Sequence, residues 1–257
     1  IKKLMNYKLD GIPILNYGAK PLRTDQAFAL HGMFDLPKRV GKTEHNWGTS
    51  IEPFVHAEDI QLDGRNMALH VALKKAQLDN FLNACIECTT LSTSFDTFNV
   101  VCRDEIRVDR FGDEWRIVEV PFWQNDYQLK SLTVSPSGGE LYTIDDYNLP
   151  VDFGAYISTV GGSENIGNRI EVETTEFYQR SSFRSTRNVN ITGVFKGINP
   201  DDLYAKVCQL HALLMKPGLR ELVIRNKKLN VYFKSGMTAT AFKEDILQFN
   251  LIASVGD

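Results

Sequence analysis

Cysteine and histidine are the residues of this chain whose types best suit metal binding or nucleophilic chemistry. Cys85 and Cys88 form a Cys-x-x-Cys pair, a spacing found in structural zinc sites and redox centres. Such a site needs a second pair of ligands, and no His-Glu-x-x-His spacing occurs among the five histidines, which are His31, His45, His56, His70 and His211. We therefore predict that the protein holds neither a metal nor a cofactor.

The motifs of hydrolases and of phosphate-binding proteins are also absent from the sequence. No Gly-x-Ser-x-Gly turn presents a nucleophile. The glycine-rich run 161–167 lacks the Gly-Lys-Ser/Thr of a phosphate-binding loop, so a hairpin turn is the simpler interpretation. Glu58, Asp59 and Asp63 lie near His56, but nothing in the sequence indicates the desolvation that acid–base catalysis uses. The sequence thus predicts a protein that is not an enzyme.

Composition limits the classes of partner. The 257 residues carry a formal net charge of -3, which excludes a strongly basic chain held to nucleic acid by counterion release alone. No apolar run approaches the roughly 20 residues that span a bilayer, and the opening residues 1–6 turn polar too soon for a signal peptide. We expect a soluble protein made in a cytoplasm, in which any contact with DNA is local.

The sequence at the start of the chain, which could position functional residues, occurs a second time past the middle. The opening segment YKLDGIPILNYGA (7–19) is matched in the same order, with small gaps, by YTIDDYNLPVDFGA (142–155). A period of more than one hundred residues indicates that each copy is a domain.

A second block repeats without a gap at a constant offset of 122. It places Arg65-Asn66 over Arg187-Asn188 and keeps apolar residues at equivalent positions, namely Met67/Val189, Leu69/Ile191, Leu73/Phe195, Phe81/Leu203, Leu91/Leu213 and Val101/Val223. At this offset each cysteine faces an aliphatic residue, in the pairs Cys85/Val207, Cys88/Leu210, Cys102/Ile224 and Cys208/Ile86. We interpret the cysteines as small buried hydrophobic side chains. The polar pairs His70/Thr192 and His211/Thr89 indicate tolerated positions at element edges.

The pattern of each copy predicts elements in the order strand, hairpin, strand, helix, strand and strand. Apolar residues at helical spacing predict a first helix over 77–91, and Asn199, Pro200 and Pro217-Gly218 mark the start and end of a second. Period-two alternation predicts strands over 67–73 and 189–195 before the helices. Further strands are expected over 98–102, 106–111, 115–122, 222–225, 229–233 and 242–251. The fold class is α+β and mainly β, with two tandem similar β-barrel or sandwich domains that each carry one flanking helix.

The predicted domain boundaries are 1–124 and 141–257, joined by a turn-rich linker over 125–140. The copies differ most between the Gly-Ala pair and the Arg-Asn pair, where 20–64 is longer than 156–186. Length variation marks surface excursions, in which binding residues tend to lie. We expect long hairpins in both places.

One of these excursions has the composition of an interface. The segment 177–187 alternates aromatic residues with arginines, which suits a protein partner or nucleic acid. A strand with one packed and one solvated face is the alternative. The candidate contact residues are Phe177, Tyr178, Arg180, Phe183 and Arg184.

The whole arrangement resembles the tail-tube fold family of bacteriophages, and in particular distal tail and baseplate hub proteins. The resemblance is carried by YKLDGIPI…YGA with YTIDDYNLP…FGA, by the strands RNMALHVALKK and RNVNITGVFKG, and by the helix-then-hairpin ending of each copy. It implies a structural ring component of a phage or prophage tail, located in the virion tail after assembly in the bacterial cytoplasm. DNA would be transiting cargo, and other tail proteins would be partners.

Two assemblies stay open at this point. Distal tail proteins commonly pair one tube-like domain with a different second domain and form hexamers, whereas hubs with two tube-like domains form pseudo-hexameric trimers. A β-sandwich module that binds a carbohydrate or a surface receptor is the alternative function, and an enzyme whose site escapes motif analysis is the third.

Overall fold

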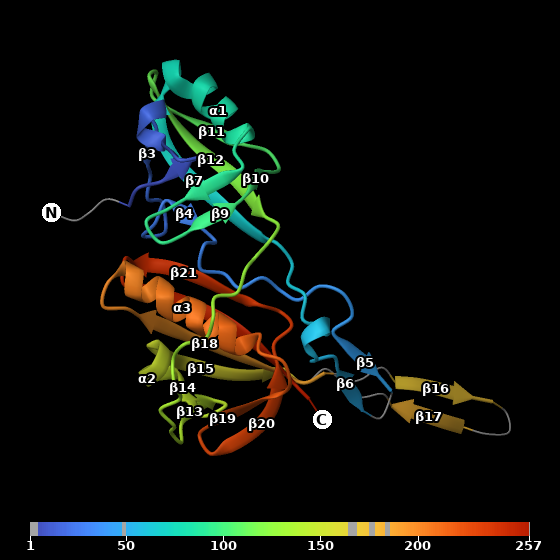
Figure 1. The fold of residues 1–257 in the computed structure, drawn as a ribbon. Helices are drawn as coiled ribbons and strands as arrows, with labels where there is room; N and C mark the ends of the chain where they lie inside the picture. The colour runs from blue at the N-terminus through green and yellow to red at the C-terminus, as the bar shows by residue number, and fades with distance from the viewer. Residues whose placement is uncertain (1–4, 48–49, 164–168, 175–177, 183–185, 257) are drawn as a thin grey trace.

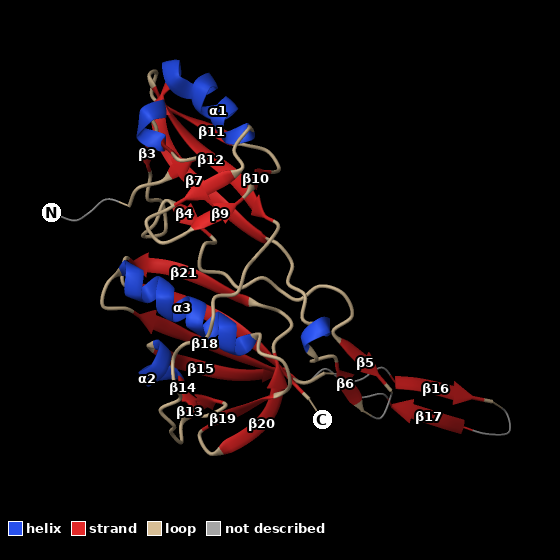
Figure 2. Ribbon diagram, in the orientation of Figure 1, coloured by secondary structure: helices blue, strands red, loops and turns tan. Residues whose placement is uncertain are grey.

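The computed structural model describes residues 5–47, 50–163, 169–174, 178–182 and 186–256, and for residues 163, 169–173 and 178–182 it describes the backbone alone. Two lobes lie one above the other, and two hairpins project to one side beside the lower lobe (Figure 1). Strands dominate and helices are few, so the fold is α+β and mainly β (Figure 2). No helix in the described part of the chain is long and apolar enough to cross a membrane.

The first lobe contains two small antiparallel sheets, ordered β2-β1-β8-β9 and β10-β12-β7-β3, with β4 on β7 and β11 on β12. Its elements are β1 (Lys8–Leu9), β2 (Ile12–Pro13), η1 (Ile14–Tyr17), β3 (Lys20–Pro21), β4 (Leu30–His31), β5 (Glu44–Asn46), β6 (Ile51–Pro53), η2 (Ala57–Asp59), β7 (Arg65–Lys74), η3 (Lys75–Gln77), α1 (Leu78–Ile86), β8 (Thr90–Ser92), β9 (Thr97–Asn99), β10 (Val101–Cys102), β11 (Arg107–Phe111) and β12 (Trp115–Gln124).

The second lobe contains one larger sheet, ordered β14-β13-β19-β20-β22-β18-β15, with β21 on β22. Its elements are β13 (Tyr142–Ile144), β14 (Tyr147–Asn148), α2 (Leu149–Phe153), β15 (Ala155–Ser163), β16 (Arg169–Glu173), β17 (Tyr178–Ser182), β18 (Asn188–Lys196), α3 (Pro200–Leu214), β19 (Arg220–Ile224), β20 (Lys227–Tyr232), β21 (Met237–Lys243) and β22 (Ile246–Val255). The pairing order of the first lobe is therefore repeated, with β20 in the place of β9 and β10.

The opening hairpins of the two lobes are built on the same hydrogen bonds. Asp10 and Asp145 both adopt a positive φ, a conformation that aspartate tolerates better than most residues. The amide of Asp10 donates to the Thr90 carbonyl at 2.9 Å, and its carboxylate accepts from the Thr90 amide at 2.8 Å. Asp145 makes the same two bonds with Glu221, at the same distances. Each aspartate thus ties its turn to the strand after the helix.

The equivalence of the lobes corrects the offset inferred from the sequence. The helices begin at Leu78 and Pro200, as the offset of 122 predicts. The last strands begin at Trp115 and Ile246, an offset of 131, and six of the nine added residues lie in the helix, since α1 has 9 residues and α3 has 15. The pairings Leu91/Leu213, Val101/Val223, Cys88/Leu210, Cys102/Ile224 and His211/Thr89 were therefore wrong. Strand pairing places Leu91 with Leu222 and Val101 with Tyr232.

Two element boundaries also differ from expectation. The first helix ends at Ile86 instead of continuing to Leu91, and the strand predicted over 242–251 is divided by a turn between β21 and β22. The second helix begins as predicted, because Asn199 accepts a hydrogen bond from the Asp202 amide at 2.9 Å and Pro200 follows it. Period-two burial runs along β12 and β18, so each buries one face in its lobe.

A single hydrophobic cluster extends through both lobes. Across the junction, Phe34 contacts Tyr204 on α3 at 5.9 Å between ring centroids, and Phe95 stacks on the same ring at 5.3 Å. The linker 125–140 runs along α3, where the Thr133 amide donates to Gln209 at 2.6 Å. The lobes are thus packed against one another and are not merely tethered.

Candidate assembly interface

The residues with catalytic chemistry are engaged in structural roles. His211 is buried within α3 and its Nδ1 lies 2.7 Å from the Tyr127 hydroxyl, so it is not at an element edge as predicted. Burial lowers the pKa of His211 to about 3, which keeps the ring neutral. His56 and Asp59 cap the short helix η2, where Glu58 is exposed. No group of three or more metal-ligating side chains occurs among the described residues.

The cysteines are free thiols in hydrophobic surroundings. Cys85, Cys88 and Cys208 are buried, and Cys102 is half-buried. Burial raises the pKa of Cys88 to about 11 and raises the pKa of Cys85 further. Because the thiolate is the reactive form, these pKa shifts oppose nucleophilic chemistry.

The main candidate for a functional site is the seam, the line along which the two lobes meet. The segment 26–39 of the first lobe lies along the outer edge of β21 in the second. Leu36 and Met237 exchange two backbone hydrogen bonds, at 2.9 and 3.0 Å, and the Ala27 amide donates to the Ala241 carbonyl at 2.8 Å. This seam gives the edge of β21 the partner that an isolated edge strand lacks.

Side chains from both lobes are buried in the seam. Phe28, Phe34 and Leu36 are at most 4 % exposed, as are Met237 and Ala241 of β21. The half-buried carboxylate of Asp35 accepts from the Ala239 amide at 2.7 Å. Burial outweighs this bond and raises the pKa of Asp35 to about 6. The seam is therefore an apolar contact completed by backbone hydrogen bonds.

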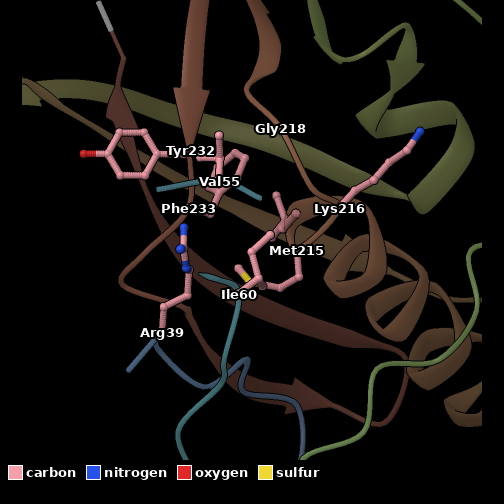
Figure 3. Close-up of a pocket in the computed structure, with 9 residues that line it drawn as sticks. Arg39, Val55, Ile60, Met215, Lys216, Gly218, Tyr232 and Phe233 are labelled. Carbon is pink, nitrogen blue, oxygen red and sulfur yellow. The ribbon is translucent and has the colours of Figure 1, made fainter. Parts of the chain in front are cut away.

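Beyond the seam, the chain continues as an arm (residues 37–63) that crosses the second lobe. Arg39 reaches a cavity of about 10 Å³ beside Tyr232, Phe233 and Met215, shown in Figure 3. Its guanidinium donates to the carbonyls of Phe54 at 2.5 Å and Asp59 at 3.1 Å. Arg39 thus holds the arm together from within, while its aliphatic stem and Ile60 pack toward the second lobe.

Glu44 on β5 fixes the arm to the second lobe. Its carboxylate pairs with Lys234 at 2.5 Å, accepts from the Thr186 hydroxyl at 2.9 Å and also accepts from the Tyr232 hydroxyl. Burial acts to raise the pKa of Glu44, but the hydrogen bonds from Lys234, Tyr232 and Thr186 outweigh it and lower that pKa. Since Thr186 lies between β17 and β18, Glu44 joins the bases of both projecting hairpins.

The two projecting hairpins match the predicted excursions. The β5–β6 hairpin carries Trp47, which is 64 % exposed and whose indole nitrogen donates to Glu52 at 2.8 Å. The β16–β17 hairpin extends farther from the body (Figure 1). Of the predicted contact residues, Tyr178 and Arg180 lie on β17, opposite Glu173 and Glu171, with their backbones alone described. Phe177, Phe183 and Arg184 lie outside the described residues.

An open cavity of about 490 Å³ also lies between the lobes, lined in part by Trp123, Arg103 and Lys38. The Trp123 ring lies close to Gly64 and 5.0 Å from the Arg103 guanidinium carbon, so both take up part of its surface.

Comparison with solved structures found a structural likeness. The chain is similar to the solved structure of the Dit protein of SPP1, described as a paradigm of the hub adsorption apparatus in phages that infect Gram-positive bacteria. The TM-score is 0.35 at 9% identity, over 97% of this chain and 99% of that one. No family model and no curated protein matches the chain.

Proposed function

We propose that this protein is a structural ring component of a phage or prophage tail, either a distal tail protein or a baseplate hub. In this proposal the segments 1–124 and 141–257 are two similar tube-like domains joined by the linker 125–140. The ring surrounds a channel through which DNA passes as cargo. The protein works by assembly in the virion tail and not by catalysis.

The seam between the lobes carries this proposal. Two copies of one topology are joined head to tail, because the segment 26–39 of the first copy covers the β21 edge of the second. A head-to-tail contact between similar units is heterologous, and its repetition gives a closed ring or an open filament. A chain that already contains one such contact has the geometry of a ring segment. If the two copies alternate around a six-unit ring, three chains complete it.

The arms support the same proposal. The first arm crosses from its own lobe onto the next lobe, where Glu44 and Arg39 anchor it. The β16–β17 hairpin occupies the equivalent place in the second copy, between β15 and β18. We infer that it reaches a neighbouring subunit or the next ring, with Phe177, Tyr178, Arg180, Phe183 and Arg184 as contact residues.

Electron microscopy of the chain assembled with its tail partners, or of the virion, tests this function. We expect a ring at the end of the tail tube, and we expect Phe183→Asp to weaken its assembly while each lobe stays folded by circular dichroism. The protein found as a free monomeric enzyme, outside any tail structure, would contradict the proposal. So would a virion in which antibody labelling places the chain away from the tail.

Receptor binding is the second candidate, and the exposed Trp47 favours it. The indole is fixed by its bond to Glu52 and by the edge contact with His45 at 4.1 Å, so it presents an apolar face to solvent. A glycan array probed with the wild-type chain and with Trp47→Ala tests this role. Retention that depends on Trp47 would support it, and equal signals from both proteins would exclude Trp47 as the contact.

A further inference from the structure

The two lobes provide an internal comparison of covered and uncovered strand edges. Strand β11 holds in the first lobe the place that β21 holds in the second, since each pairs with the last long strand of its lobe. At the offset of 131, Val108 corresponds to Ala239 and Arg110 to Ala241. Ala239 and Ala241 contribute the backbone groups that the segment 26–39 binds in the seam.

The equivalent edge of β11 has no such cover. All five of its residues are exposed, with Phe111 at 67 % and Val108 at 38 %. Among the described residues, no third strand pairs with β11. The neighbouring position repeats the contrast, because Tyr232 is 2 % exposed beneath the first arm whereas its equivalent Val101 is 53 % exposed. The surface that is buried in the second lobe is thus open in the first.

The complementary open edge is β15. It corresponds to β3 and β4, because Tyr156 opposite Val194 matches Lys20 opposite Ala72, and Val160 opposite Ile191 matches Leu30 opposite Leu69. The segment that contains β4 covers β21, whereas β15 ends its sheet with no partner on its outer side among the described residues. Both edges also depart from regular pairing at the same place. β15 has a bulge between Ile157 and Thr159, and the first lobe has its longer excursion between Pro21 and Leu30.

The composition of β15 suits pairing with another chain. Nine residues, Ala155 to Ser163, contain no charged side chain and no proline. Edge strands of monomers are usually protected by charge, proline, brevity or a bulge, and of these β15 has only the bulge between Ile157 and Thr159. Its outward side chains include Tyr156 at 51 % and Val160 at 38 % exposure. On the opposite edge, Arg107 and Asp109 pair with each other at 3.1 Å, so the β11 charges are partly neutralised before docking.

We propose that β15 of one copy of this chain pairs antiparallel with β11 of the next copy, and so repeats between chains the seam that joins the lobes within one chain. The partner is a second copy of the chain because, within one chain, the first lobe already covers the equivalent edge of the second lobe. The inference rests on the proposed ring function and names the surfaces that form it.

Disulfide trapping between two variants that each carry one engineered cysteine, with the buried Cys85, Cys88 and Cys208 retained, tests the pairing directly. Val108→Cys and Val160→Cys are made separately in a Cys102→Ser background, since Cys102 is the half-buried native thiol near this edge. The variants are mixed in equal amounts, assembled with tail partners and oxidised. We expect a disulfide-linked dimer from the mixture and none from either variant alone, because each chain then offers one edge only.

The alternatives give different products. A dimer from Val160→Cys alone would mean that two β15 strands pair with each other, which overturns the proposal. Rings visible by electron microscopy without a mixed dimer would also overturn it, while leaving the ring function intact. Absence of rings and of any tail location would instead contradict the proposed function, and this inference would fail with it.

A matched pair of lysine substitutions measures the contribution of the β15 edge to self-association. Val160→Lys places a charge on β15, and Ile198→Lys places one at an exposed position outside both edges, where Ile198 is 86 % exposed. In analytical ultracentrifugation we expect Val160→Lys to weaken self-association by about tenfold or more and Ile198→Lys to leave it unchanged. Thermal unfolding of both variants should match the wild type. Equal association constants for the two variants would overturn the assignment of β15.

Discussion

The edges of β21 and β11 occupy the same place in two copies of one topology, yet one is buried and the other is open. The difference does not lie in the strands' own pairing, since both form a hairpin with the long strand that follows. It lies in the segment 26–39 of the first lobe, which reaches β21, whereas among the described residues no segment of the second lobe reaches β11. Two similar lobes can therefore cover a strand edge in one of them and leave the equivalent edge of the other open.

The largest expected effect concerns the covered edge. Phe34 is 3 % exposed and lies 5.5 Å from Phe28 and 5.9 Å from Tyr204. Phe34→Ala should lower the free energy of unfolding by about 3–5 kcal/mol, because it leaves a cavity in the seam. Phe111→Ala, on the open edge, should change it by less than about 0.5 kcal/mol. Urea denaturation measures both, and similar losses in the two variants would remove the contrast between the edges.

The equivalent aspartates of the two opening turns, Asp10 and Asp145, should give an effect of intermediate size on the free energy of unfolding. Asp145 also pairs with the nearly buried Arg220 at 2.5 Å, whereas Asp10 has no ion pair among the described residues. Asp145→Asn should therefore lower the free energy of unfolding by about 2 kcal/mol, since a hydrogen bond to a charged group is lost.

Asp10→Asn serves as the control for Asp145→Asn, because asparagine keeps an acceptor oxygen and tolerates positive φ. We expect it to cost less than about 1 kcal/mol. Chemical denaturation followed by tryptophan fluorescence measures both variants. A larger loss from Asp10→Asn would show that the Arg220 ion pair adds nothing to the common turn.

The smallest effect concerns the anchor of the first arm. Glu44→Gln should lower the free energy of unfolding by about 1 kcal/mol at pH 7, because it removes the charge that faces Lys234. The pKa of Glu44 is lower in the folded protein than its usual 4.5, so its contribution is full above that value and is lost as the pH falls through the folded pKa.

Denaturation at pH 7 and pH 3 should therefore show a difference between wild type and Glu44→Gln that shrinks at the lower pH. Glu221→Gln is the matched control, since its pairing with Lys228 is exposed and should contribute less than about 0.5 kcal/mol. A difference for Glu44→Gln that stays constant with pH would exclude the ion pair as its cause.

Regular elements near the helices were predictable from the residues. The alternation in 67–73 and 189–195 and the cap at Asn199 are local signals, and β7, β18 and the start of α3 follow them. The offset failed after the helices because α3 is six residues longer than α1, and hydrophobic periodicity did not distinguish a short helix followed by a strand from a longer helix. Where a helix ends depends on tertiary contacts, and in α3 the last turns carry His211, which lies against Tyr127 of the linker.

The sequence alone determined that the fold is mainly β with few helices, and it predicted two similar copies with extended hairpins, because turn residues and hydrophobic periodicity act over a few positions. Only the tertiary structure decided which strand edges are covered. The bonds of the seam join Ala27 to Ala241 and Leu36 to Met237, residues about two hundred positions apart. No local pattern encodes such a contact, since it depends on how the two folded lobes meet.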